Sequence, residues 1–277
     1  MTGLLLVLAA AFFVEVGDSI GKTEVSRKQE SIYTFGFLAI LWGTIFLIAL
    51  AFIRDSFTFS IASLPTLSIR IVLEIIQAHI TMLAITKADR STFGFLRIVT
   101  IPLLLGIDLL LGYSIGTYDF LGIGFIVGAL IILFMNHGIQ RGGALLVLIS
   151  SINAAITISL YKYNITHFNS VEVEQVIVHV ILLIYFFIMA ATVAKENPLQ
   201  FLRKPIFFIQ SAAAGIGTVL ISFAYLFAAA SIITTVKRAA GILWAMLSGN
   251  VYFKEKHFLL KLFSLILIVV GLVLLAL

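Results

Sequence analysis

Residues 4–22 read LLLVLAAAFFVEVGDSIGK, and residues 144–162 read ALLVLISSINAAITISLYK. When the two stretches are aligned at a shift of 140 residues, six positions are identical, namely Leu5, Leu6, Val7, Leu8, Ser19 and Lys22 with their counterparts. At the same shift Arg97 aligns with Lys237. Matches among apolar residues arise easily, whereas two matched cations do not. The alignment therefore predicts two homologous halves that divide near residues 137–141.

The composition predicts that these halves lie in a membrane. Of the 277 residues, 61% are hydrophobic and 11% are charged, whereas soluble domains have about 45–50% apolar and about 25% charged residues. Apolar runs of about 20 residues, enough to cross about 30 Å of hydrocarbon, recur between short polar breaks. We expect an all-α integral membrane protein, most simply of the plasma membrane, with ten transmembrane helices at about 2–20, 32–53, 67–87, 91–112, 118–136, 142–164, 171–194, 204–229, 231–252 and 257–277.

Five spans per half is an odd number, so the second half must enter the bilayer upside down. This predicts an inverted 5+5 repeat of residues 1–139 and 140–277, an architecture that many secondary transporters use. Two such halves can close on each other, so a monomer is sufficient and a homodimer is allowed. Cations gather in the loops opposite the two termini, so the positive-inside rule favours both termini outside the cell.

Several function classes are not expected. The chain has no cysteine, which excludes disulfides and thiolate metal sites. Its cations are scattered rather than clustered on a soluble module, so no nucleic-acid partner is expected. We find no metal-ligand, nucleotide or nucleophile motif, and so expect neither a cofactor nor an enzyme. The expected partners are the lipid bilayer, a small-molecule substrate and, as a candidate coupling ion, the proton.

The segment TTVKRAAGILW (234–244) places two cations, Lys237 and Arg238, about six residues inside the ninth predicted span. A charge at mid-bilayer costs about 2.5–3.5 kcal/mol and is a functional hypothesis by default. The two side chains either line a polar cavity or are accommodated by snorkelling and internal salt bridges. Together with Arg97, they predict a cavity of positive potential and hence an anionic substrate.

Other charged residues suggest coupling or gating. Glu15, Asp18 and Lys22 share one face of the first span, where the carboxylates could relay protons or Asp18 could pair with Lys22. Arg70 and Glu74 are spaced for an ion pair within a helix. Lys22 and Lys162 are expected at equivalent helix ends, as gate or structural pairs.

Simpler structural roles are expected for the remaining polar positions. His79 and His179 each lie in an apolar run and are expected to be hydrogen-bonded core residues. Asp108 is expected to cap its own span. The glycines of LGIGFIVG (121–128) are expected to allow close helix packing, and the glycosylation triplet at 164–166 is of a kind that is frequent by chance.

These features together resemble the drug/metabolite transporter superfamily, specifically its EamA-type ten-span carriers. The resemblance covers essentially the whole chain and rests on the 5+5 repeat, the lysines at 22 and 162, and the segment LSGNVYFKEK, which keeps Gly249, Phe253 and Glu255 where that family often has Gly, Phe and Glu. Asn250 and Glu255 close the ninth span, where the loop carboxylate either braces neighbouring helix ends or lies on the solvated surface. The first half lacks the corresponding acidic residue in LLLGYSIGTYDF.

The resemblance also implies a role for the Lys-Arg pair. Triose-phosphate translocators and nucleotide-sugar transporters, distant members of the superfamily, carry such a pair in the ninth helix, and in the translocators it holds phosphate. TTVKRAAGILW is similar to that segment, which points to Lys237 and Arg238. The family usually keeps both termini in the cytoplasm, the reverse of the orientation that the loop charges favour.

The sequence thus predicts a secondary-active transporter of a small organic solute, anionic or phosphorylated, with Lys237, Arg238 and Arg97 as its anion site. One alternative is an exporter of amino acids or amphipathic drugs in which the cations are structural. Alternatives of other classes are a membrane-embedded lipid-phosphate enzyme and a non-transporting membrane subunit.

Overall fold

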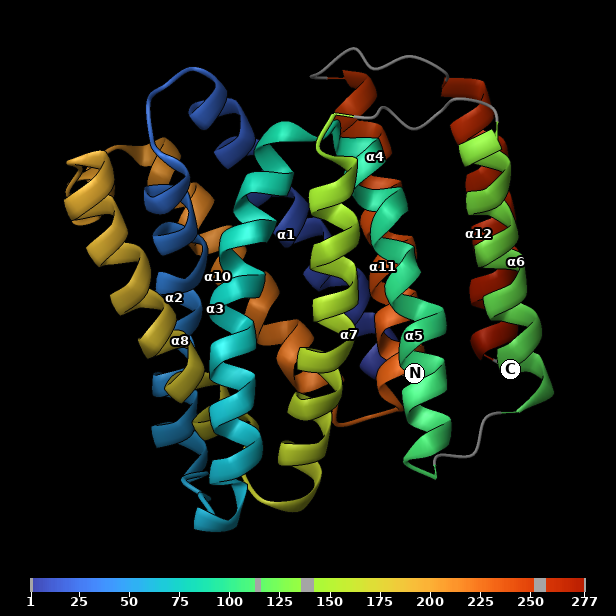
Figure 1. The fold of residues 1–277 in the computed structure, drawn as a ribbon, viewed down its shortest axis with the longest axis horizontal. Coiled ribbons are helices and arrows are strands. Elements are labelled where there is room, and N and C mark those ends of the chain that lie inside the picture. Colours follow the sequence, from blue (N-terminus) through green and yellow to red (C-terminus); the bar gives the residue numbers. More distant parts are fainter. Residues whose placement is uncertain (1, 113–115, 136–141, 252–257, 277) are drawn as a thin grey trace.

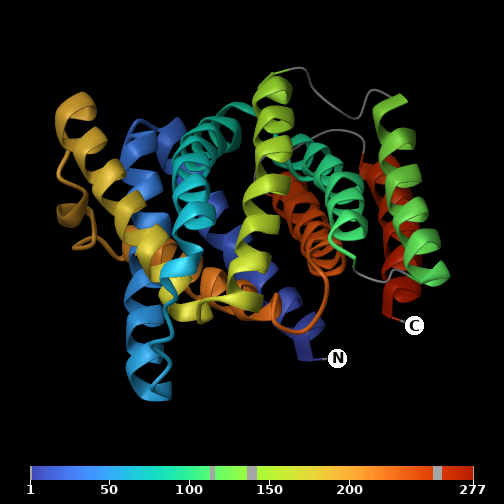
Figure 2. The same cartoon turned by 60° about the horizontal axis from the view of Figure 1, so that its bottom comes forward.

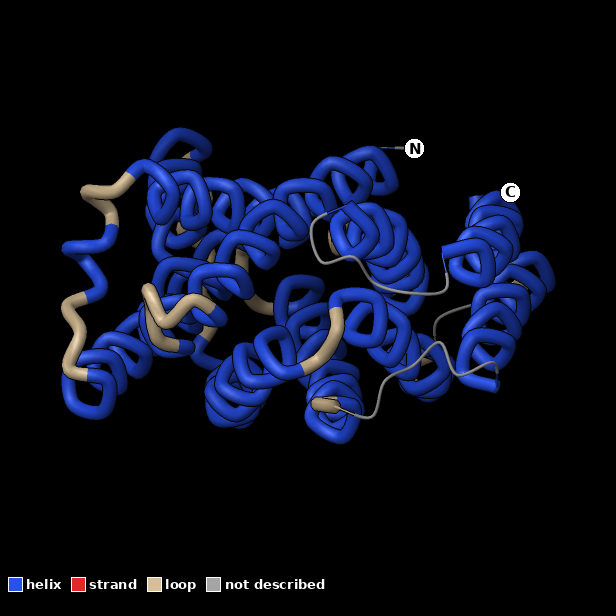
Figure 3. The backbone as a smooth tube through the Cα atoms, turned by 90° about the horizontal axis from the view of Figure 1, so that it is seen from above, coloured by secondary structure: helices blue, strands red, loops and turns tan. Residues whose placement is uncertain are grey.

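A computed structural model describes every residue except 1, 113–115, 136–141, 252–257 and 277, and all regular elements in the described part are helical. Figures 1 and 3 show a bundle of long helices with short connections. The elements are α1 (Thr2–Ser26), α2 (Ile32–Arg54), η1 (Ile61–Ser63), α3 (Leu64–Lys87), α4 (Arg90–Leu96), η2 (Arg97–Val99), α5 (Thr100–Leu110), α6 (Thr117–Met135), α7 (Ala144–His167), α8 (Val171–Met189), η3 (Ala190–Ala194), α9 (Pro198–Phe201), α10 (Pro205–Ala224), α11 (Ala230–Val251) and α12 (Phe258–Ala276).

The helices are those of a multi-pass membrane protein. In the described part of the chain, eight helical segments are long and apolar enough to cross a membrane by length and composition. They correspond to the first four and to the sixth to ninth predicted spans. The other two, α6 and α12, contribute shorter described apolar stretches, at Thr117–Ala129 and Leu262–Gly271.

The fourth predicted span is not one continuous helix. It consists of α4 and α5 joined by the 3₁₀ turn η2, which begins at Arg97. Pro102 follows one turn later, and a proline removes the hydrogen bond to the carbonyl four residues earlier and clashes with it. Pro102 therefore explains the tighter 3₁₀ turn at Arg97–Val99. Arg97 lies where the helix changes geometry.

Helices from the two halves of the sequence pack on each other in reciprocal pairs. Helix α1 packs against α10 and α7 against α3, while α2 contacts α8, α11 contacts both α4 and α5, and α6 contacts α12. The α6–α12 pair stands at one edge of the bundle (Figures 1 and 2). The principal apolar clusters lie between the reciprocal pairs, one around Val7, Ala155 and Ile233 and another around Phe35, Phe186 and Phe207.

Glycine packing was predicted correctly only in part. A Cβ on Gly271 would lie 2.6 Å from the Gly122 carbonyl oxygen, so α12 and α6 do approach closely there. Gly124 and Gly128 of the same expected motif have no neighbouring atom within 4 Å of such a Cβ. The small residue that this contact requires is Gly271 of α12, which lies against Gly122 and Ile126 of α6.

Candidate functional site

Arg97, Lys237 and Arg238 lie together in the middle of the bundle. They line both of two adjoining cavities, of about 50 Å³ and about 210 Å³. Among the described residues, neither a hydrogen bond nor an ion pair reaches the side chains of these three cations, although the Arg97 guanidinium lies 4.9 Å from the centre of the Phe93 ring. The Nε atoms of Arg97 and Arg238 are buried without a partner. The structure thus gathers three positive charges at one place with no carboxylate bound to them.

The first cavity ends at a cluster of two carboxylates and an arginine. Arg90 at the start of α4 donates to Glu15 through Nε at 3.1 Å and Nη2 at 2.6 Å, and Nη2 also lies 3.3 Å from Asp18 Oδ2. Ser19 and Ser248 donate to the same Glu15 carboxylate at 2.8 Å and 2.6 Å. This cluster therefore ties α1 to α4 and α11.

The second cavity is lined at its far end by Arg70 of α3. Arg70 donates to Glu174 at 2.7 Å and to Gln175 at 2.6 Å, and it lies 3.6 Å from Glu74. Its guanidinium also stacks 4.6 Å from the centre of the Tyr161 ring. The expected pair within α3 exists, but the shorter ion pair is with Glu174 on α8.

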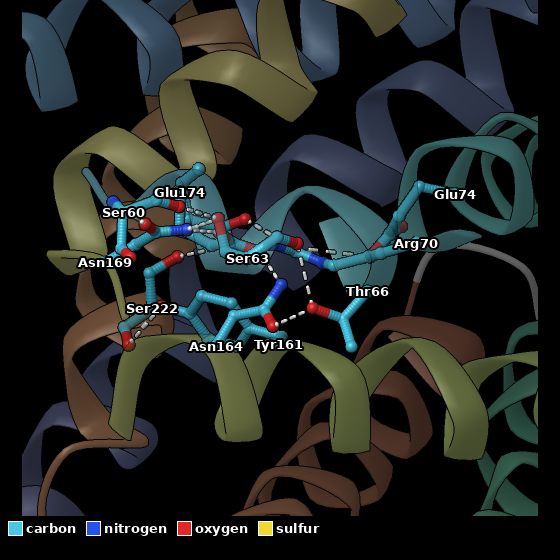
Figure 4. A network of polar contacts seen from close by, with 11 residues as sticks. Ser60, Ser63, Thr66, Arg70, Glu74, Tyr161, Asn164, Asn169, Glu174 and Ser222 are labelled. Atoms are coloured by element: carbon cyan, nitrogen blue, oxygen red, sulfur yellow. Dashed lines mark hydrogen bonds and ion pairs between the residues drawn. The ribbon is translucent and has the colours of Figure 1, made fainter. Parts of the chain in front are cut away.

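Glu174 is the centre of a wider polar network, which Figure 4 shows. Besides Arg70, its carboxylate accepts hydrogen bonds from Asn164 at 2.8 Å and Asn169 at 2.6 Å. Asn164 in turn accepts from Thr66 at 2.6 Å. The network joins the start of α3 to the end of α7 and the start of α8. It also buries Asn164, the asparagine of the glycosylation triplet.

The two clusters lie toward opposite ends of the bundle, because Arg70 is near the start of α3 and Arg90 follows its end. With all side chains ionised, each cluster has two carboxylates and one arginine, and so one excess negative charge. The three unpaired cations lie between them. Five cations and four carboxylates leave one net positive charge, concentrated at Arg97, Lys237 and Arg238.

Lys22 and Lys162 were expected at helix ends, but both lie inside helices, since α1 continues to Ser26 and α7 to His167. The Lys22 ammonium donates to the carbonyl oxygen of Ala88, the residue that follows α3. The Lys162 ammonium donates at 2.7 Å to the carbonyl oxygen of Tyr225, the residue that follows α10. Each lysine thus satisfies a carbonyl at a helix C-terminus, in equivalent places of the two halves.

The simpler structural predictions had mixed outcomes. His79 is hydrogen-bonded to the Tyr185 hydroxyl at 2.6 Å, as expected. His179 is buried, but no hydrogen bond reaches it from the described residues, so that prediction was wrong. Asp108 caps a helix other than its own, since Oδ2 accepts from the Ser231 backbone N–H at the start of α11. Phe253 and Glu255, and the side chain of Asn250, lie outside the described residues.

Arg90 and Glu174 were not predicted as site residues from the sequence. Arg90 follows Lys87 and Asp89 and fell in the break between the third and fourth predicted spans. Glu174 begins an apolar run, where an acidic residue normally faces water near a helix N-terminus. The charge balance could have indicated them, because Glu15 and Arg70, if buried, each require a partner of opposite charge.

Comparisons with known proteins leave the function open. No family model matches the chain, and no curated protein matches its sequence. One solved structure, described only as "Crystal structure of protein", superposes with a TM-score of 0.61 at 12% identity, over 95% of this chain and 95% of that chain. At this identity the similarity establishes a shared fold and carries no information on what is bound or moved.

Proposed function

We propose that this protein is a secondary-active transporter of a small organic anion, working by alternating access between two inverted five-helix halves. The observation that carries the proposal is the group of three cations, Arg97, Lys237 and Arg238, that line a cavity among apolar helices and are bound by no carboxylate of the described residues. Buried charges are normally paired, because removing an ion from water costs several kcal/mol. An anion from outside the protein would supply the missing partner.

The chemistry of the three cations suits a carboxylate or a phosphate. The two guanidinium groups can each donate two parallel hydrogen bonds to oxygens, and the lysine adds a mobile point charge. Because Arg97 comes from the first half and the other two from the second, the anion would contact both halves. A ligand that bridges the halves is what alternating access requires.

The packing supports an inverted repeat. The first helix of each half packs against the third helix of the other half, and the second, fourth and fifth helices pack against their counterparts. Lys22 and Lys162 satisfy carbonyls at equivalent places. This pattern agrees with the resemblance to the drug/metabolite transporter superfamily and with an EamA-type carrier.

The two arginine–carboxylate clusters suit the role of gates. The Arg90 cluster lines the 50 Å³ cavity toward one end of the bundle, and Arg70 and Glu74 line the 210 Å³ cavity toward the other. In this scheme Glu15 and Asp18 share one arginine, so a proton taken up by one carboxylate would weaken that gate. The same two residues are therefore the candidates for proton coupling.

The proposal is tested by ligand-dependent thermal stability of the purified protein, because a ligand that binds only the native state raises its melting temperature. The panel contains phosphorylated metabolites, carboxylates, amino acids and cationic drugs. We expect phosphates or carboxylates to stabilise the wild type but not the Lys237→Ala/Arg238→Ala double variant. The matched control is Arg27→Ala/Lys28→Ala, which removes two adjacent exposed cations and should respond like the wild type.

The opposite result would favour the exporter of amino acids or drugs. If only zwitterionic or cationic compounds stabilise the protein, and the Lys237→Ala/Arg238→Ala variant responds equally, the cations are structural. Glu74 lines the 210 Å³ cavity and is only weakly paired with Arg70, at 3.6 Å. Its carboxylate would then receive the ligand ammonium.

A further inference from the structure

The wall of the 210 Å³ cavity contains two neutral polar side chains, each with one hydrogen-bonding atom that is unused. Gln77 of α3 is 8% exposed and His179 of α8 is 7% exposed. Gln77 Oε1 and His179 Nδ1 are both buried without a hydrogen-bond partner in the part of the chain that the structure describes, and both residues line the cavity. Buried polar atoms are nearly always paired, so two unpaired atoms in one cavity require an explanation.

The orientation of the Gln77 amide follows from its neighbours. One of the two terminal atoms of the Gln77 amide lies 3.1 Å from Thr81 Oγ1 and 2.8 Å from Ser150 Oγ. These two hydroxyls lie 2.8 Å from each other. Three contacts need three hydrogens, and the two hydroxyls supply only two. The amide must therefore donate, so Nε2 faces the hydroxyls. Oε1 is left as a fixed acceptor.

Most of the other neutral polar groups on this wall already have hydrogen-bond partners. The Tyr161 hydroxyl donates to the Ser222 carbonyl oxygen at 2.9 Å, Gln175 bridges Arg70 and Ser222, and the Tyr225 hydroxyl is bonded to Thr234. Thr157 donates to the Ala154 carbonyl oxygen at 3.3 Å. Among the described neutral groups of this wall, the unused capacity is thus at Gln77 and His179, which are buried, and at the hydroxyl of Thr218, which is only half-buried.

We propose that Gln77 and His179 form a neutral subsite that binds the body of the transported anion, so that the protein selects anions carrying hydroxyl or amino groups over their aliphatic analogues. The inference rests on the proposed function. A fixed acceptor at Gln77 requires a donor on the ligand, and the neutral imidazole can either donate or accept. A cavity of about 210 Å³ also has room for more than the anionic group, since one water molecule occupies about 30 Å³ of liquid.

The aliphatic analogues are rejected for a physical reason. A ligand that fills the cavity without hydroxyl or amino groups displaces water from Gln77 and His179 and returns no hydrogen bond. Sites built to bond a polar ligand group discriminate strongly against analogues that lack it, because their own polar atoms are then left unpaired.

The test compares matched ligand pairs by equilibrium binding to the purified full-length protein. The pairs are glycerol 3-phosphate and propyl phosphate, glucose 6-phosphate and hexyl phosphate, and gluconate and hexanoate. We expect the hydroxylated member of the pair that binds to have the lower Kd by about tenfold or more. Gln77→Met and His179→Phe, tested separately, should each reduce this ratio severalfold, mainly by weakening the hydroxylated ligand.

Thr157→Val is the matched control, because it removes from the same wall a hydroxyl that already has a partner, and it should leave the ratio unchanged. Equal affinity for both members of a pair in the wild type would overturn the subsite while leaving the proposed function intact. The same holds if both variants fold, judged by their melting temperatures without ligand, and keep the wild-type ratio. If no anion of the panel binds, the proposed function fails and the subsite fails with it.

Discussion

Arg90 shows how a single buried cation can hold three helices. Its guanidinium is 2% exposed and bonds to Glu15 and Asp18, and Glu15 is in turn bonded to Ser248 of α11. Replacing Arg90 by methionine keeps an unbranched apolar stem but removes the guanidinium group, and so leaves two carboxylates without their cation. Because removing one partner leaves an uncompensated buried charge, we expect the free energy of unfolding to fall by about 3–5 kcal/mol. Denaturant unfolding in detergent measures this loss.

Arg27→Met is the matched control for this prediction. Arg27 also lies in an ion pair, with Glu24 at 3.3 Å, but its side chain is 67% exposed. Exposed pairs contribute about 0–1 kcal/mol, so this substitution should be almost neutral. If the free energy of unfolding falls equally in the two variants, the buried ion pairs of Arg90 do not stabilise the contacts of α1 with α4 and α11.

Glu30 is a buried acid outside the membrane-spanning segments, in the short connection between α1 and α2. It is 3% exposed, one carboxylate oxygen accepts from Gln210 Nε2 at 3.0 Å, and the other has no partner. Burial raises the pKa of Glu30 from its ordinary value of 4.5 to about 8, opposed by the Gln210 hydrogen bond and reinforced by the nearby carboxylates of Glu24 and Glu196.

This raised pKa gives the stability a definite pH dependence. Between about pH 4.5 and pH 8 the folded state holds a proton on Glu30 that the unfolded state has released. Stability falls with rising pH wherever the native state binds more protons. We therefore expect the melting temperature to decline across this window in the wild type, and to decline less in Glu30→Gln, which stays neutral and keeps an acceptor for Gln210. Identical pH profiles for the two proteins would contradict a buried, protonated Glu30.

Among the helices, the contact between α2 and α10 depends on glycine. A Cβ on Gly215 would lie 2.6 Å from the Gly43 backbone nitrogen and 2.8 Å from Trp42 Cβ. Even a methyl group would push the two helices apart, and overpacking of this kind costs about 1–3 kcal/mol. We expect Gly215→Ala to be destabilised by that amount in thermal or denaturant unfolding.

Gly106→Ala separates this close contact from the general effect of removing a glycine. Gly106 lies within α5, and a Cβ there would have no neighbour within 4 Å. Alanine favours a helix over glycine by about 1 kcal/mol, so this variant should be neutral or slightly more stable. A stabilised Gly215→Ala variant would show that α2 and α10 are not in close contact.

The positions of most helices could be predicted because each apolar run has the length that a membrane demands, but their ends could not. Helix α1 continues past its apolar part to Ser26, since a helix satisfies its own backbone whether or not its side chains are apolar. The break at Arg97 had a visible cause in Pro102, which a hydropathy pattern does not reveal.

The charged residues of the candidate site were predictable where they lie inside apolar runs or where the repeat pointed to them, but their partners on other helices were not. Arg97 and Lys237 are equivalent in the alignment and share a cavity in the structure. Arg90 pairs with Glu15 across 75 residues and Arg70 with Glu174 across 104, and no periodicity within one helix encodes such pairs. The orphaned atoms of Gln77 and His179 depend on how neighbouring helices face them, which requires the tertiary structure.

For the whole molecule, the proposed alternating access requires the two halves to move against each other. Helix α1 of the first half lies on α10 of the second, and a Cβ on Gly17 would lie 3.1 Å from Ala214 Cβ. A disulfide needs a Cβ–Cβ distance of about 3.5–4.5 Å, so a small shift lets cysteines at these two positions form a bridge. The sequence contains no other cysteine, so any disulfide within one molecule must be this one.

We expect the oxidised Gly17→Cys/Ala214→Cys protein, reconstituted in liposomes, to lose uptake of the anion that stabilises the wild type best. Reduction should restore uptake, and binding of the anion to the oxidised protein in detergent should change only severalfold, because neither Gly17 nor Ala214 lines either of the two cavities. Gly17→Cys alone carries the same added bulk without a bridge, so its uptake should not respond to oxidant. Undiminished uptake by fully bridged protein would show that α1 and α10 move as one body, and that the motion between halves lies elsewhere or does not occur.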